Sequence, residues 1–141
     1  MAITFCGVMS VAIAAPRETV EGVWSFKTDG SDGCTMNGQL IVKPKGKDGL
    51  HACTLRTRNV CPSVSGDAAE DCTLDASSGQ VVIKSGPPKM SNVKYEGDQE
   101  PTYSPDDFTL RIENESLMTG FLQSGNGEVP AIFFRGPAQT S

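Results

Sequence analysis

Hydrophobic and polar residues alternate in short runs along most of the chain, and turn residues separate one run from the next. This period-two pattern is typical of β-strands that bury one face. The clearest run starts at Asp106, where Phe108, Leu110 and Ile112 share a face and polar residues stand between them. The pattern predicts strands at Val20 to Lys27, Gly38 to Lys43, Leu50 to Thr57, Cys72 to Asp75, Gln80 to Ser85, Asn92 to Glu96, Asp106 to Glu113, Leu117 to Gln123 and Val129 to Arg135.

Helical periodicity is weak along the whole sequence. The nearest candidate, Ser65 to Asp71, has only Ala68 and Ala69 as apolar residues, so we expect at most one helical turn there. The last three predicted strands are joined by short polar turns, which predicts an antiparallel meander. Many short strands without helices predict an all-β fold, an antiparallel up-and-down β-barrel, with a β-sandwich as the alternative.

The stretch between Lys84 and Tyr103 interrupts the regular spacing of the predicted strands. It contains Pro87, Pro88 and Pro101, together with several acidic residues. Proline has no backbone N–H group and cannot donate a hydrogen bond within a central strand. We therefore expect this stretch to form a long loop or an excursion at a sheet edge.

The N-terminal segment from Met1 to Ala15 contains no charged side chain and ends in small residues before Pro16. Such a run is typical of a secretory signal peptide and is too short to span a bilayer. We expect residues 1 to 14 to be this signal and residues 15 to 141 to be a single all-β domain, periplasmic or secreted. Because a basic start is missing, a misassigned start codon, a truncated leader and a buried N-terminal strand stay open as alternatives.

Cleavage at that point leaves four cysteines, Cys34, Cys53, Cys61 and Cys72. An even number in a short exported chain predicts two disulfides, which form in the periplasm or outside the cell. The sequence does not distinguish the three possible pairings, and we favour Cys34 with Cys53 and Cys61 with Cys72. Zinc is the alternative, but no Cys-x-x-Cys pair is present and His51 is the single histidine, so no metal is expected.

Charge and the single histidine narrow the possible functions. The chain has 12 basic and 17 acidic residues, a net charge of -5, whereas proteins that bind a phosphate backbone normally present a basic face. We therefore expect no nucleic-acid partner. Nucleophilic catalysis usually needs a histidine base, and His51 shares a strand face with Cys53, which export would oxidise. We expect no enzyme activity and no cofactor.

The remaining charged pairs are expected to be solvated. Asp106 with Asp107, and Glu70 with Asp71, do not match the spacing of a calcium-binding loop. Arg56 and Arg58 lie on the strand face opposite Cys53 and Leu55, and they are expected on the barrel exterior.

A family resemblance rests on Gly22-Val23-Trp24 near the start of the first strand and on Phe133-Phe134-Arg135-Gly136 at the end of the last. This arrangement resembles that of the calycins and implies a barrel base in which Gly22 and Trp24 pack and Arg135 lies across the indole. Within the calycins, the chain is most similar to bacterial periplasmic inhibitors of serralysin-type metalloproteases, on Val20 to Trp24, Gly33-Cys34 and a second cysteine after a hairpin.

The resemblance and the lack of a catalytic set predict an exported, monomeric binding protein. Its partner would be a protein, such as a secreted protease, bound through the loops or through an N-terminal arm made of Ala15, Pro16, Arg17, Glu18 and Thr19. The alternatives are a carrier of a small apolar ligand and an envelope-associated structural protein. A carrier needs a hollow barrel, and bulky residues are expected to fill this one: Trp24, Phe26, Phe108, Phe121 and Phe134.

Overall fold

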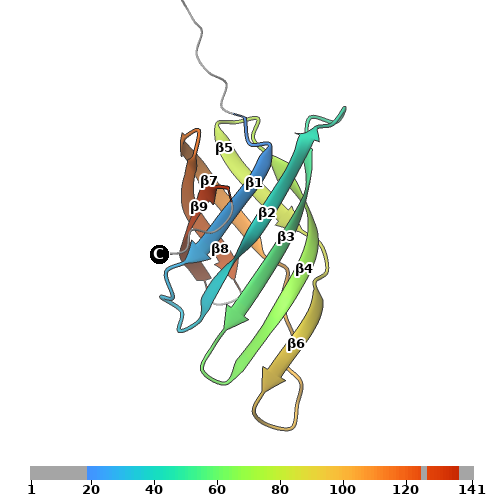
Figure 1. The fold of residues 1–141 in the computed structure, drawn as a ribbon, viewed down its shortest axis with the longest axis vertical. Helices are drawn as coiled ribbons and strands as arrows, with labels where there is room; N and C mark the ends of the chain where they lie inside the picture. Colours follow the sequence, from blue (N-terminus) through green and yellow to red (C-terminus); the bar gives the residue numbers. More distant parts are fainter. Residues whose placement is uncertain (1–18, 125–126, 137–141) are drawn as a thin grey trace, which may run out of the picture.

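The computed structural model describes residues 19–124 and 127–136, and this part of the chain consists of nine β-strands joined by turns and loops (Figure 1). The strands are β1 (Gly22–Thr28), β2 (Thr35–Lys45), β3 (His51–Val60), β4 (Val64–Asp75), β5 (Gln80–Ser85), β6 (Lys89–Tyr95), β7 (Asp107–Asn114), β8 (Leu117–Ser124) and β9 (Gly127–Arg135). No helix occurs within these described ranges. The predicted all-β class is confirmed.

Eight of the strands form a closed antiparallel barrel in the order β1-β2-β3-β4-β5-β7-β8-β9. The ring closes because β1 is paired at both edges: Trp24 lies opposite Leu40 of β2 and opposite Arg135 of β9. Closure leaves these strands without the free edges that promote aggregation. The predicted barrel is therefore confirmed, and the sandwich alternative is wrong.

β4 is longer than the barrel requires and is shared between two partners. Its last residues, Cys72 to Asp75, pair with β5, whereas Val64 to Ala69 pair with β6. β6 stands at the end of the sheet order, so its second edge is unpaired within the described chain. In Figure 1, β6 and the adjoining ends of β3 and β4 reach below the barrel. We call this three-stranded part the extension.

The first half of β4 corrects one expectation, because Ser65 to Asp71 forms a strand and not a helical turn. The residues of this strand that face inward, Gly66, Ala68 and Glu70, are buried in strict alternation with their neighbours. Because these inward residues are small or acidic, they differ little in hydrophobicity from the outward residues between them. The strand is held by its pairing with β3 and β6, which the local sequence does not reveal.

The barrel interior is filled by side chains around three phenylalanines. The Phe26 and Phe133 rings stack with their centroids 4.7 Å apart, and Phe108 meets them edge-on at 5.5 and 5.0 Å. Offset-stacked and edge-to-face pairs of this kind add stability beyond the apolar area that they bury. Other buried members of the same cluster are Trp24, Leu40, Leu55, Leu74, Val81, Ile83, Leu110, Met118 and Leu122. The interior is a packed core.

Two of the aromatic residues expected in this core lie elsewhere. Phe121 is 43% exposed and Phe134 is half-buried, while Phe133 fills the centre. Because side chains alternate along a strand, Met118 and Leu122 of β8 and Ala131 and Phe133 of β9 take the inward positions. Phe121 and Phe134 occupy the alternate positions of these strands, which face away from the core.

Both disulfides form, but their pairing differs from the one that we favoured. Cys53 is bonded to Cys72, and Cys34 is bonded to Cys61. The cause is the antiparallel register: Cys53 lies directly opposite Cys72 on β3 and β4, and Cys34 and Cys61 flank a register pair of β2 and β3. The Cα atoms are 4.9 and 4.2 Å apart within the two pairs.

Peptide mapping of the unreduced protein is expected to show this pairing. Digestion with trypsin and a glutamate-specific protease separates Cys61 from Cys72 by cleavage after Glu70. We expect a linked pair of residues 28–45 with 59–70, and a second pair of residues 48–56 with 71–84, in the mass spectrum. A linkage of residues 28–45 to 48–56 would contradict the register of β2, β3 and β4.

Candidate functional site

The two ends of the barrel differ, and one end is closed by the residues of the predicted barrel base. The Arg135 guanidinium lies over the Trp24 ring, with Cζ 4.1 Å from the ring centroid. Its nitrogens donate to the backbone carbonyls of Thr19 (2.8 Å), Glu115 (3.1 Å) and Glu21. The structure thus brings Trp24 and Arg135 together as the resemblance implied, and the contact combines cation-π attraction with charged hydrogen bonds.

The predicted N-terminal arm starts at this closed end. Ala15, Pro16, Arg17 and Glu18 lie outside the described residues, and Thr19 is the first residue described. Thr19 is exposed, whereas Val20 is buried and its carbonyl accepts a hydrogen bond from Trp24 Nε1 at 3.0 Å. Gly22, the third base residue, has φ of +114° and leaves space for the Arg135 side chain.

Substitution of Arg135 by glutamine is expected to lower the free energy of unfolding by about 1–2 kcal/mol, because hydrogen bonds from a charged donor and the contact with Trp24 are lost. Urea unfolding followed by the fluorescence of Trp24, the single tryptophan, measures the change. Arg111→Gln is the matched control, since Arg111 forms an exposed ion pair with Glu113. Its effect should stay below about 0.5 kcal/mol. Equal effects of both variants would contradict a stabilising role for the base.

The opposite end of the barrel is an open mouth bordered by the loops of residues 29–34 and 96–106. The second loop returns from β6 to β7 across the mouth, and Tyr103 in its middle is half-buried. Between this loop and the extension lies an apolar groove of about 210 Å³. We call it the mouth groove, and its walls include Val64, Gly66, Met90, Val93, Pro101 and Tyr103.

A cluster of buried polar groups lies beside the mouth groove. Glu70 is 2% exposed and Asp106 is 5% exposed. The Tyr103 hydroxyl donates to Asp106 Oδ2 at 2.9 Å, and the Asp106 backbone N–H donates to Glu70 Oε1 at 3.2 Å. Glu70 Oε2 and Thr57 Oγ1 are buried without a hydrogen-bond partner among the described residues. The bond from the Asp106 N–H to Glu70 of β4 ties the end of the loop to the barrel wall, and the Tyr103 hydroxyl bond holds the loop to itself.

Burial governs the protonation of this cluster. The pKa of Glu70 is raised to about 9, mainly by loss of solvation and in smaller part by the neighbouring Asp106 side chain. Burial also raises the pKa of Asp106 and that of the Tyr103 phenol. The charged groups that act on the two carboxyls are Asp106, Asp107 and Glu70, all acidic. The Glu70 carboxyl therefore keeps its proton at neutral pH.

This cluster corrects the expectation that Glu70 and Asp106 are solvated. Of their neighbours, Asp71 is exposed as expected, whereas Asp107 is half-buried and its carboxylate accepts a hydrogen bond from the Ser85 backbone N–H at 2.9 Å. The phase of the alternation contained the signal. Glu70 is in phase with Cys72, and Asp106 is in phase with the buried Phe108.

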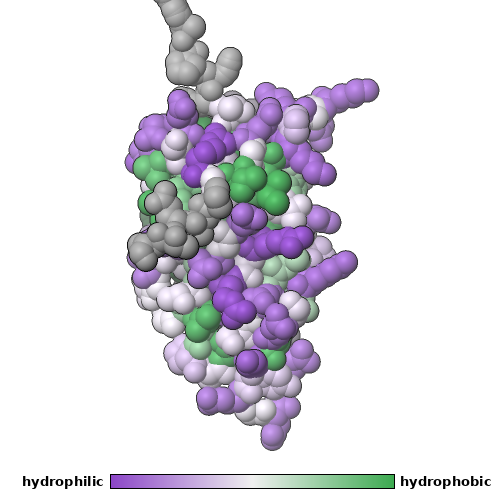
Figure 2. Space-filling model, viewed as in Figure 1, coloured by the Kyte–Doolittle hydropathy of each residue, from purple (hydrophilic) through white to green (hydrophobic). Residues whose placement is uncertain are grey.

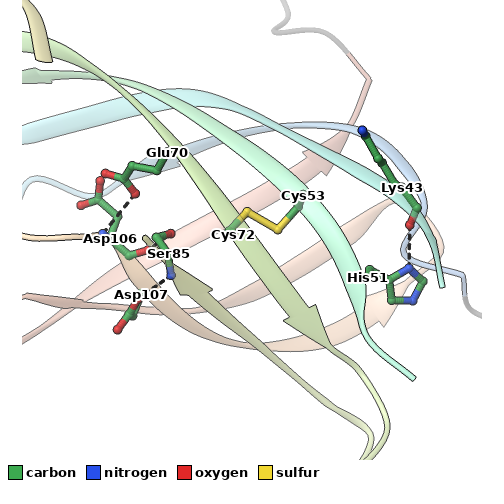
Figure 3. The surroundings of a disulfide bond; sticks show 8 residues. All are labelled: Lys43, His51, Cys53, Glu70, Cys72, Ser85, Asp106 and Asp107. Carbon is green, nitrogen blue, oxygen red and sulfur yellow. Dashed lines mark hydrogen bonds between the residues drawn. A yellow bond between two sulfur atoms is a disulfide. The ribbon is translucent and has the colours of Figure 1, made fainter. Parts of the chain in front are cut away.

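His51 lies apart from the acidic cluster. Figure 3 shows the Cys53–Cys72 disulfide between the two carboxyls and His51. His51 is buried on the same strand face as Cys53, and its Nδ1 lies 2.8 Å from the Lys43 carbonyl oxygen. In residues 19–124 and 127–136, no three histidine, cysteine or carboxylate side chains converge as a metal site.

Other exposed residues lie on the outer surface. Arg56 and Arg58 are exposed as expected, and Arg58 Nε forms an ion pair with Asp67 at 3.2 Å. Figure 2 shows a mainly polar surface with a green apolar patch over the upper parts of β1 and β2. Val23 and Ile41, which are register partners on these strands, are each 37% exposed. Among the described residues, no helix is long and apolar enough to cross a bilayer.

Comparisons with known proteins agree with the barrel. No protein-family model and no curated protein matches the chain. Among solved structures, a de novo designed fluorescence-activating β-barrel is similar, with a TM-score of 0.56 and 13% sequence identity over 83% of this chain and 93% of the designed chain. At this identity the likeness concerns the fold alone. The chain thus belongs to the class of eight-stranded antiparallel β-barrels, and two disulfides cross-link its strands.

Proposed function

We propose that this chain is an exported, non-catalytic binding protein that captures an extended segment of a protein partner in the mouth groove. The observation that carries the proposal is the filled barrel interior, where Phe26, Phe108 and Phe133 occupy the centre. A carrier of a small apolar ligand needs that space. Binding is therefore assigned to the outside of the barrel, where the mouth groove is the hollow with apolar walls.

The extension supplies the exposed apolar surface that such a partner would cover. Val60, Met90 and Tyr95 are 44%, 38% and 41% exposed, and all three belong to β3 or β6. Exposed apolar residues that gather beside a groove are typical of interaction sites. The free edge of β6 is blunted by a register shift and by Asn92, whose φ is +54°. Side chains seated in the groove, more than added strand pairing, would provide the affinity.

Export is supported by the cysteines and by the leader. Two disulfides among the described residues are typical of proteins in an oxidising compartment. The apolar segment of residues 1–14 fits a secretory signal. The partner would then be met in the periplasm or outside the cell.

Affinity capture from the secreted proteins of the source organism, with three baits, tests the proposal. We expect the unchanged protein to retain a specific partner that Met90→Asn loses, because a polar amide replaces an apolar side chain in the wall of the mouth groove without changing its charge. Val23→Asn is the matched control, since Val23 is equally exposed on a different face. Equal retention by all three baits, or a lipophilic small molecule in the native mass spectrum of the purified protein, would overturn the proposal.

A second candidate function, at the opposite end of the barrel, is inhibition of a secreted metalloprotease through the arm from Ala15 to Thr19. The anchoring of Thr19 by Arg135 favours it, because a held base reduces the entropy lost when an arm binds. Addition of the protein to a serralysin-type protease should then slow the cleavage of a peptide substrate. Full protease activity at micromolar concentrations of this chain would overturn the inhibitor, and would leave the groove as the binding site.

A further inference from the structure

We infer that the segment bound in the mouth groove is cationic, with lysine or arginine side chains beside an apolar one. The inference rests on the proposed function and names the chemistry of the partner. It follows from the acidic character of the loops at the mouth, which the sequence alone does not reveal because these loops lie far apart in the chain.

The loops at the mouth carry acidic residues and no basic ones. The loop of residues 29–34 and the loop of residues 96–106 contain neither lysine, arginine nor histidine. Their acidic members are Asp29, Asp32, Glu96, Asp98, Glu100 and Asp106. The opposite end has mixed charge, because the β2–β3 hairpin carries Lys43, Lys45 and Lys47 with Asp48, and the neighbouring turns carry Asp75 and Glu115. The mouth is thus the negative end of the barrel.

The two hollows on either side of Tyr103 have only acidic residues among their charged lining residues, whereas Lys94 and Glu96 both line a neighbouring hollow over the extension. The one charged residue that lines the mouth groove is Glu100. A second hollow of about 270 Å³ lies on the other side of Tyr103, and its charged residues are Asp32 and Asp106. Both exposed carboxylates, Glu100 and Asp32, therefore border apolar surface without a basic residue in either lining. An apolar side chain in the groove would place flanking cations next to them.

Electrostatic complementarity favours a cationic segment over an anionic or an uncharged one. An anionic segment would be repelled by the acidic loops, and an uncharged one would leave their potential unused. The first and last described residues, Thr19 and Gly136, both lie at the end of the barrel opposite the mouth. The Thr19 carbonyl accepts a hydrogen bond from Arg135, and the Gly136 carbonyl accepts one from Ser25. A second copy could offer its lysine-rich hairpin, and repetition of this head-to-tail contact would build filaments. Self-association is for that reason one outcome of the test.

Three blocked hexapeptides test the inference: Gly-Lys-Leu-Leu-Lys-Gly and the versions with glutamine or glutamate in place of lysine. Amide NMR shifts of Met90 and Val93 report binding to the groove. We expect the lysine peptide to bind about tenfold more tightly than the glutamine peptide, and the glutamate peptide to bind more weakly still. The advantage of lysine should shrink in about 0.5 M salt, because exposed charges are screened.

Charge-neutral variants locate the effect. Glu100→Gln and Asp32→Asn should each weaken the lysine peptide about threefold and leave the glutamine peptide unchanged. Asn at position 32 keeps the oxygen that accepts the Cys34 backbone N–H. Asp48→Asn on the opposite hairpin is the matched control, with a similar capping bond to Leu50 and no expected effect.

The outcomes separate the inference from the proposed function. Equal binding of the lysine and glutamine peptides, with loss of both in Met90→Asn, would overturn the cationic partner and keep the groove. Absence of shifts at Met90 and Val93 with every peptide would overturn the groove itself. Concentration-dependent sedimentation that Lys45→Glu abolishes would identify the lysine hairpin of a second copy as the occupant, which would keep the cationic chemistry and overturn the separate protein partner of the proposed function.

Discussion

Gly120→Ala is expected to lower the free energy of unfolding by about 3 kcal/mol or more, because a side chain at this point of β8 meets backbone atoms. A Cβ atom on Gly120 would lie 2.1 Å from the Thr109 carbonyl oxygen and 2.7 Å from the Leu110 Cα. The backbone atoms of a paired strand cannot move away from the added Cβ atom, whereas a side chain could rotate away from it. The β7–β8 pair would have to separate, and the core above Leu110 would open.

Gly38→Ala in β2 tests the same explanation at a second position of the barrel, and we expect it to lower the free energy of unfolding as well. Its Cβ atom would lie 1.9 Å from the Arg56 carbonyl oxygen. Glycines at such close approaches let strands bend sharply, as a barrel requires at its corners. Gly86→Ala is the control, since its Cβ atom would sit 3.5 Å from the nearest atom, and its cost should stay within about 0.5 kcal/mol. Urea midpoints that are equal for Gly86→Ala and Gly120→Ala would contradict this account.

Alternation predicted the strands wherever hydrophobic contrast was strong. The bounds predicted for β5, Gln80 to Ser85, are those found, and β7 differs by one residue at each end. The first half of β4 was missed because its buried positions hold glycine, alanine and glutamate. These positions are buried by two neighbouring strands and by the loop across the mouth. Such contacts join segments that are distant in the sequence, so the local pattern does not reveal them.

The cysteine pairing failed for the same reason. Cys53 can be placed opposite Cys72 only if β3 and β4 form a hairpin around the turn of residues 61–63. With Ser65 to Asp71 taken as a turn, that register was not available. The number of disulfides follows from composition, whereas their connectivity follows from strand pairing.

The candidate site was predictable in part. The positions of Glu70 and Asp106 within their strands already assign them to the buried face, once β4 is known to start at Val64. The mouth groove was not predictable, because it depends on the path of the loop from Glu96 to Asp106 over the extension. The Pro-rich stretch was expected to be a loop or an edge excursion, and it supplies both β6 and this loop.

Stability is expected to fall as the pH rises from about 4.5 to about 9, because of Glu70. The unfolded chain loses the Glu70 proton near the ordinary value of 4.5, whereas burial, and then Asp106, raise its pKa in the folded barrel to about 9. Between these limits the folded state binds more protons than the unfolded one, so each step up in pH favours unfolding. Below the lower limit both states are protonated, and the stability associated with Glu70 is fully present.

Glu70→Gln should remove this dependence, since a neutral amide of similar shape needs no proton to stay uncharged. At pH 8 we expect the variant to unfold with a free energy roughly 2–4 kcal/mol higher than that of the unchanged protein. The two should converge near pH 4. Asp71→Asn is the matched control, because Asp71 is the exposed neighbour on the same strand. Urea unfolding at several pH values measures all three, and parallel curves for Glu70→Gln and the unchanged protein between pH 5 and 9 would show that Glu70 is ionised in the fold. In that case the carboxylate, and not a bound proton, would lie beneath Tyr103 at the mouth.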